Sequence, residues 1–184
     1  MRSRFDEQLA QLNREMIEMG AQCEEVIALA SKALTEADMK LAAKVAPLSA
    51  DIDRKEREIE ALCLRLLLQQ QPVARDLRQV SAALKMITDM ERIGDQAEDI
   101  SEIIVFLRGR CDSDEIGTLL RDMARSTIKM VTESVDAYVK HDIIVAEKVT
   151  ADDDIVDDYF DRVKRKLIDK IASSPADGEY ALDL

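Results

Sequence analysis

A row of carboxylates is the feature of this sequence best suited to chemistry. It lies within residues 82–107, AALKMITDMERIGDQAEDISEIIVFL. Each α-helical residue turns the chain by about 100°, so four of these carboxylates fall within about 60° of one another, with Asp99 beside them. We call this face the acidic ridge, and its four members are Glu91, Asp95, Glu98 and Glu102. On roughly the opposite side, an apolar stripe predicts a buried face: Ala83, Met86, Met90, Ile93, Ala97, Ile100, Ile104 and Leu107.

The ridge is unfavourable for an isolated helix. Each like-charge pair at this spacing costs roughly 0.2–0.5 kcal/mol, and only Arg92 and Lys85 offer opposite charge nearby. Hard cations prefer several carboxylate oxygens, and the motif Glu91-x-x-x-Asp95 places two of them one turn apart. The pattern therefore has two interpretations, a metal site or a solvated face of an acidic protein.

Gly94 lies inside this predicted helix, where it costs roughly 1 kcal/mol relative to alanine. It indicates either the close approach of another helix or ligand, or a tolerated surface glycine.

The remaining reactive side chains do not form a recognisable enzyme site. His141 is the only histidine, which excludes the di-iron bundles that need two Glu-x-x-His motifs, and it is expected at a corner between helices. The sequence has no glycine-rich phosphate loop and no Gly-x-Ser-x-Gly motif. The acidic run 150–162, TADDDIVDDYFDR, lacks the glycine and the spacing of a calcium loop. A metal-dependent hydrolase would need a positioned base or nucleophile, so we expect a protein that is not an enzyme.

Apolar residues recur at steps of three and four, and Gly (5) and Pro (3) are scarce, which predicts an all-α protein of long helices. Pro47 is expected to bend or restart the second helix. The polar stretch RGRCDSD at 108–114 predicts a boundary between domains 1–108 and 109–184. The helices are expected over about 5–34, 38–70, 73–107, 114–140 and 142–172, with another starting near Glu179.

The two halves of the chain repeat each other at a spacing of about 104 residues. The matched pairs include Asp38 with Asp142, Ala42 with Ala146, Lys44 with Lys148, Ile52 with Val156, Asp53 with Asp157 and Ile59 with Val163. This pattern predicts two tandem antiparallel three-helix bundles, although two unrelated amphipathic helices also align in this way. The counterpart of Glu91 would fall near position 195, so the third helix of the second bundle is expected to be incomplete. Its exposed apolar stripes predict pairing with another copy, or aggregation.

The formal net charge of −12 disfavours nucleic acid and anionic membranes as direct partners. It suits cations and basic protein surfaces, or simply confers solubility. Cys23, Cys63 and Cys111 form no Cys-x-x-Cys motif and are expected to be buried free thiols in a reducing compartment. The start of the chain, MRSRFDEQLAQL, has no signal-peptide h-region, and no apolar run reaches the roughly 18 residues of a membrane span. We expect a soluble cytoplasmic protein.

Three segments carry a resemblance to a known family. They are DMERIGDQAEDI at 89–100, its lead-in QQQPVARDLRQVSAALKMITDMERIGD at 69–95, and DGEYALDL at 177–184. The sequence resembles the PhoU family over essentially its whole length. The resemblance implies two three-helix bundles related by a pseudo-twofold axis, with one Glu/Asp-x-x-x-Asp motif on the third helix of each.

The resemblance further implies that members similar to this sequence can bind clusters of metal ions at that motif. Carried over by position, the resemblance implies carboxylate ligands at Glu91, Asp95, Asp99 and Glu102, although members often have Asn where Asp99 stands. The metal identity is left open among iron, zinc, manganese and magnesium. The second motif has no residues in this chain.

The resemblance also implies a role. Proteins of this family restrain phosphate uptake and phosphate-starvation signalling, as adaptors between the phosphate ABC transporter ATPase and a sensor histidine kinase. They act by contact at the inner face of the membrane, reached through partners, and often as dimers. The alternative is a metal-binding helical scaffold or chaperone-like protein without a phosphate role.

Overall fold

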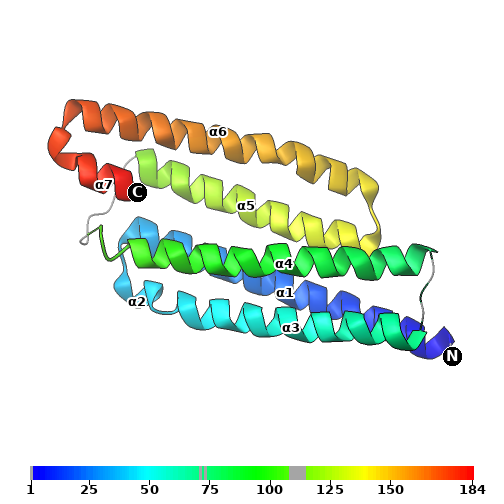
Figure 1. Ribbon diagram of the computed structural model, residues 1–184. Coiled ribbons are helices and arrows are strands. Elements are labelled where there is room, and N and C mark those ends of the chain that lie inside the picture. The colour runs from blue at the N-terminus through cyan, green and yellow to red at the C-terminus, as the bar shows by residue number, and fades with distance from the viewer. Residues whose placement is uncertain (1, 71, 73, 108–114) are drawn as a thin grey trace.

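The computed structural model describes residues 2–70, 72, 74–107 and 115–184, and no strand occurs among them. Figure 1 shows the long helices lying side by side with nearly parallel axes, with shorter helical segments near their ends. They are α1 (Arg2–Glu36), α2 (Met39–Ala42), α3 (Val45–Gln70), α4 (Ala74–Ile103), α5 (Glu115–Lys140), α6 (Ile143–Ser173), the 3₁₀ helix η1 (Pro175–Asp177) and α7 (Gly178–Asp183). The predicted all-α class is confirmed. None of these helices combines the length and the apolar character that crossing a bilayer requires.

The first bundle consists of α1, α3 and α4, which pack on one another through a single apolar core. Burial raises the pKa of the Cys63 thiol to about 11 and that of Cys23 to about 12, so both are inert free thiols, as expected. The expectation for Cys111 lies outside the described residues. The fully buried side chains of this core include Leu12, Met16, Met19, Cys23 and Val26 of α1, Ile52, Ile59, Cys63 and Leu66 of α3, and Val80, Ala83 and Ile87 of α4.

The second bundle has two long helices, α5 and α6, with the short α7 packed on α6 (Figure 1). Its own core is small and consists of Ile116, Leu119, Leu120 and Val163. Its third helix, α7, has six residues in this chain, and the expectation that this helix is incomplete remains a prediction. The predicted boundary between residues 108 and 109 falls outside the described residues and remains a prediction.

Ion pairs join α5 to α6 along their exposed faces. Lys129 Nζ lies 2.8 Å from Asp152 Oδ2, and Lys148 Nζ lies 2.7 Å from Glu133 Oε2. Both lysines share Asp152, and their hydrogen bonds lower the pKa of that carboxyl. The network holds the two helices at a fixed distance. Because exposed ion pairs contribute little to stability, the apolar contacts beneath the network supply most of it.

The two bundles meet where α5 packs on α1. A Cβ atom at Gly20 would lie 3.1 Å from Val135 Cγ2, so glycine permits the close approach of these helices. Thr132 Oγ1 donates a hydrogen bond to Glu24 Oε1 at 2.7 Å, and the Tyr138 hydroxyl donates to the Gln79 carbonyl of α4 at 3.2 Å. These contacts hold α5 against α1 and α4 of the first bundle.

Two corners of the chain have the same conformation. Asp38 (φ −93°, ψ 101°) and Asp142 (φ −93°, ψ 99°) each cap the following helix with a side-chain oxygen, and each follows a residue with positive φ. Those residues are Ala37 (φ 49°) and His141 (φ 55°). Because the two corners are 104 residues apart, they confirm the internal repeat. His141 lies at a corner between helices, as predicted, and its side chain is exposed.

The repeat is broken at one place, beside Pro47. The helix expected over 38–70 is interrupted at Ala43–Lys44 and restarts at Val45, as expected near Pro47, whereas α6 is unbroken. Proline at position 47 has no N–H for the carbonyl of Ala43, four residues earlier, and its ring collides with that carbonyl. The second half has Ala151 at the corresponding position, so its helix continues.

Glycine at the two corners should stabilise the protein. A residue with a Cβ costs roughly 1–2 kcal/mol in the left-handed region, and a change to glycine removes this cost. Part of the gain is lost because glycine also raises the conformational entropy of the unfolded chain. We expect Ala37→Gly and His141→Gly each to raise the free energy of unfolding by about 1 kcal/mol in urea titrations. The matched control, Ala10→Gly on the exposed face of α1, should lower it by about 1 kcal/mol. Destabilisation by both corner variants would contradict the corner geometry.

Candidate metal site

The acidic ridge lies beside α3, because α4 packs on α3 through Gly94. A Cβ atom at Gly94 would lie 3.3 Å from Ser49 Oγ and 3.4 Å from Ile52 Cδ1. Glycine is therefore present for the close approach of a second helix, which is one of the two interpretations of the sequence.

Helix α4 is buried over a wider arc than the predicted apolar stripe. Ala83, Met90 and Ala97 are buried as expected, and Val80, Ile87, Gly94 and Ser101, which lie outside the predicted stripe, are buried as well. Ile100 of the predicted stripe is 38 % exposed. The ridge thus borders a helix–helix contact, and Glu91 and Glu98 are only half-buried.

Three carboxylates meet at this contact. Asp53 of α3 and Glu91 and Asp95 of α4 each offer an oxygen within 4.8 Å of the others. Sequence reasoning missed Asp53 as a site residue, because it follows the core residue Ile52 on another helix and only the packing register brings it to α4. The only sequence feature that singled out Asp53 was its match with Asp157 in the internal repeat.

The electrostatics of this cluster favour a cation. Burial raises the pKa of Glu91, and the neighbouring charges of Asp95, Asp53 and Glu56 raise it further, against a smaller opposing effect of Arg92. Asp53 Oδ1 is buried and accepts no hydrogen bond from the described residues. A buried oxygen without a donor, beside two further carboxylates, fits the all-oxygen coordination that hard cations prefer.

The other two predicted ligands lie outside this cluster. Asp99 and Glu102 are exposed and belong to no group of three acidic side chains close enough to share an ion in the described part of the chain. At 1.5 Å per residue, Glu102 lies roughly 10 Å along α4 from Asp95. The structure therefore brings Glu91 and Asp95 together, adds Asp53, and places Asp99 and Glu102 further along the ridge.

The raised pKa of Glu91 predicts that removal of its charge increases the stability of the protein in a pH-dependent way. The folded protein holds the Glu91 proton more tightly than the unfolded chain, whose value is near 4.5, so the ionised carboxylate lowers stability at neutral pH. Glu91→Gln should raise the free energy of unfolding of metal-free protein at about pH 7, and the gain should vanish below about pH 4.5. Urea titrations at several pH values measure it, with Glu98→Gln as the control outside the cluster. A gain independent of pH would contradict the assignment.

Comparison with known proteins identifies the family. The model of the PhoU domain matches residues 16–104 and 120–184. A relative from Synechocystis is 36 % identical over 166 residues, covering 90 % of this chain and 74 % of its own length, and a relative from Clostridium acetobutylicum is 34 % identical over 165 residues, covering 89 % and 75 %. Both are named phosphate-specific transport system accessory protein PhoU homologs.

Solved structures have the same fold. The crystal structure of PhoU from Pseudomonas aeruginosa aligns with a TM-score of 0.89 at 30 % identity, over 97 % of this chain and 86 % of that one. PhoU from Streptococcus pneumoniae aligns with a TM-score of 0.83 at 23 % identity, over 96 % and 84 %, and supports the fold alone. The duplicated bundles, the shared corners and these matches together show that the chain belongs to the PhoU family.

Proposed function

We propose that this protein is an accessory regulator of phosphate transport, and that it restrains phosphate uptake and phosphate-starvation signalling when phosphate is ample. The observation that carries the proposal is the similarity to phosphate-specific transport system accessory proteins over about nine-tenths of the chain. The role of a negative regulator goes beyond those names and is our inference from the family.

The proposed partners are the phosphate ABC transporter ATPase and the sensor histidine kinase of the phosphate response. The protein would act as an adaptor by contact, without catalysis, in the cytoplasm and near the membrane only through its partners. Its net charge of −12 supports docking onto basic protein surfaces. Self-association is also proposed, through the exposed apolar side chains of Val105 (57 %) and Phe106 (64 %), which share a cavity with α7.

The proposed cofactor is a cation held by Asp53, Glu91 and Asp95, with Asp99 and Glu102 available to a larger metal cluster along the ridge. Iron, zinc, manganese and magnesium are the candidates. A bound cation would neutralise the cluster and tie α3 to α4. This gives the ion a structural or regulatory role, and we derive no reaction from it.

Metal binding should stabilise the protein through Asp53. A cation at a concentration of about 100 times its dissociation constant stabilises the folded protein by about 2.7 kcal/mol. Thermal unfolding detects this stabilisation as a higher Tm. Asp53→Asn should abolish the rise for whichever of the four metals produces it. Asp99→Asn, the same change further along the ridge, should retain most of it. An undiminished rise in Asp53→Asn would contradict the site, whereas a loss in Asp99→Asn would extend it along the ridge.

A genetic experiment tests the function itself. We expect deletion of the gene to leave a phosphate-starvation reporter on in phosphate-rich medium, and the wild-type gene to switch it off again. Complementation with Asp53→Asn, alongside Asp99→Asn at matched protein levels, asks whether the cluster contributes. A reporter that stays silent in the deletion strain would leave the fold assignment intact but reject the phosphate role in favour of a scaffold.

A further inference from the structure

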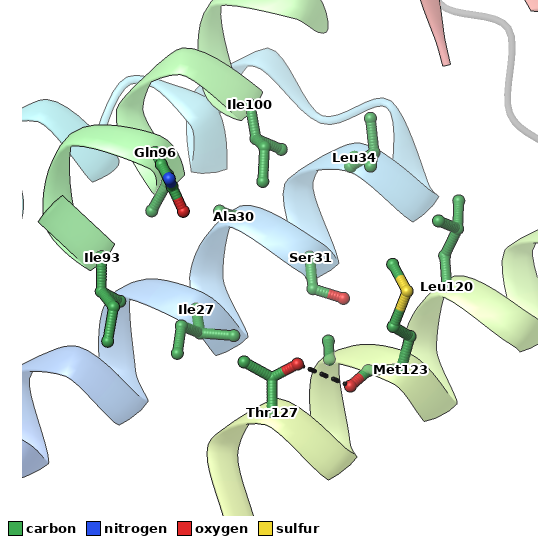
Figure 2. A pocket seen from close by; sticks show the side chains of 12 residues that line it. Ile27, Ala30, Ser31, Leu34, Ile93, Gln96, Ile100, Leu120, Met123 and Thr127 are labelled. Atoms are coloured by element: carbon green, nitrogen blue, oxygen red, sulfur yellow. Dashed lines mark hydrogen bonds between the residues drawn. The ribbon is translucent and has the colours of Figure 1, made fainter. Parts of the chain in front are cut away.

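The helices α3 and α6 lie at opposite edges of the protein, as Figure 1 shows. Between them lie α1, α4 and α5, whose side chains, among them Ile27, Ile93 and Met123, surround a cavity of about 190 Å³ (Figure 2). The residues that line this cavity all belong to these three helices. The two outer helices therefore each have a face that points away from the rest of the chain.

The outward face of α3 is basic and apolar. Six exposed residues fall within about 100° of the helix circumference, and we call them the basic stripe: Arg54, Arg57, Ala61, Leu64, Arg65 and Leu68. No acidic residue of α3 lies inside this arc, although the protein carries a net charge of −12. Leu64 is 48 % exposed and Leu68 is 80 % exposed. The stripe thus offers positive charge beside uncovered apolar surface.

The outward face of α6 carries the opposite charge. The spacing of the internal repeat carries the basic stripe onto six exposed residues of α6, which we call the acidic stripe: Asp158, Asp161, Arg165, Ile168, Asp169 and Ala172. Aspartate replaces every arginine of the basic stripe, while Leu64 becomes Ile168, which is 55 % exposed. Arg165, which corresponds to Ala61, is the one cation in this stripe.

Charge is reversed beside the stripes as well. Glu58 and Glu60 flank the basic stripe, and the repeat places Arg162 and Lys164 at the same positions on α6. An acidic surface that only keeps the protein soluble accounts for the aspartates on α6. It does not account for arginines at the equivalent positions of α3. Reversal position by position gives two surfaces that attract each other.

The two stripes do not meet within one copy. Arg54 lies 2.9 Å from Asp51, and Asp158 lies 3.6 Å from Arg162, each on its own helix. The other charged members form no ion pair in the described part of the chain. The basic stripe is exposed although α1 and α4 pack on α3. By the repeat, the acidic stripe therefore faces away from α5 and from the side of α6 that corresponds to the α4 contact.

We propose that the basic stripe of one copy docks on the acidic stripe of a second copy. A partner with an acidic surface would account for the basic stripe alone, whereas a second copy accounts for both stripes and for their shared spacing. Because the stripes lie on opposite edges, the contact is head-to-tail and extends to further copies as a row or a closed ring. This contact is separate from the apolar one at Val105 and Phe106, and it does not depend on the phosphate role.

Exchange of the charges between the stripes tests the proposal by sedimentation velocity over a range of concentrations. The basic-stripe variant is Arg54→Asp/Arg57→Asp/Arg65→Asp, and the acidic-stripe variant is Asp158→Arg/Asp161→Arg/Asp169→Arg. Each should raise the dissociation constant for self-association at least about tenfold, because like charges then face each other. The variant that combines both sets should associate as the wild type does, at the same net charge of −12.

A mixture gives a second measurement that does not need the combined variant. The basic-stripe variant retains the natural acidic stripe, and the acidic-stripe variant retains the natural basic stripe. The two should therefore associate with each other when mixed, although neither associates alone. Circular dichroism confirms that each variant folds.

Three controls separate this contact from the effect of net charge. The acidic-stripe variant is less acidic than the wild type, so its loss of association runs against net charge. Arg14→Asp/Arg121→Asp/Arg125→Asp matches the net charge of the basic-stripe variant at exposed positions elsewhere, and it should associate at least about tenfold more tightly than that variant. Added salt should weaken wild-type association, whereas without the stripes it would relieve the repulsion between acidic copies.

Three results would overturn the proposal. They are a wild-type protein that stays monomeric at every concentration, association that both stripe variants retain, and a failure of both the combined variant and the mixture to recover it. Retained association would assign self-association to Val105 and Phe106 instead. None of the three results bears on the phosphate role, which the reporter experiment tests by itself.

Discussion

The burial of α1 is the constraint on which the rest of the structure depends. Its apolar stripe contacts α3, α4 and α5, and residues such as Met16, Met19 and Val26 have no exposed surface. Burying such side chains is worth roughly 1.5–3 kcal/mol each, so this helix contributes a large part of the stability. Because α1 is shared, the first bundle and the α5–α6 pair cannot separate without exposing it. Gly20 allows α5 to pack this closely.

The same closeness creates the candidate metal site. Gly94 brings α4 against α3, and this contact gathers Asp53, Glu91 and Asp95 at its edge. Three carboxylates so close together repel one another, and the pKa of Glu91 is raised by burial and, in addition, by the charges of Asp95 and Asp53. The helices cannot move apart to relieve that repulsion without losing the core beneath it. The proposed cation would relieve that repulsion and link two helices of the bundle.

The two halves of the chain share their corners but differ in how fully they are covered. Asp38 and Asp142 turn the chain in the same way, whereas Pro47 interrupts the helix in one half and Ala151 allows it to continue in the other. The first half covers its α1–α3 pair with α4. In the second half, the helix that follows the α5–α6 pair is α7, which has six residues and packs on α6.

The sequence by itself determined the helical class, the repeat and the corner at His141, because periodicity and capping residues act locally along one chain segment. It also identified Glu91 and Asp95, which lie one turn apart on a single helix. Only the tertiary structure decided which carboxylates meet. Asp53 joins them from another helix, and Asp99 and Glu102 lie beyond the cluster. At Gly94 the structure decided between the two interpretations in favour of a close helix contact, because α4 contacts two neighbours and is buried over a wider arc than one apolar stripe. Contacts between helices depend on rotation and register, which no single periodic pattern encodes.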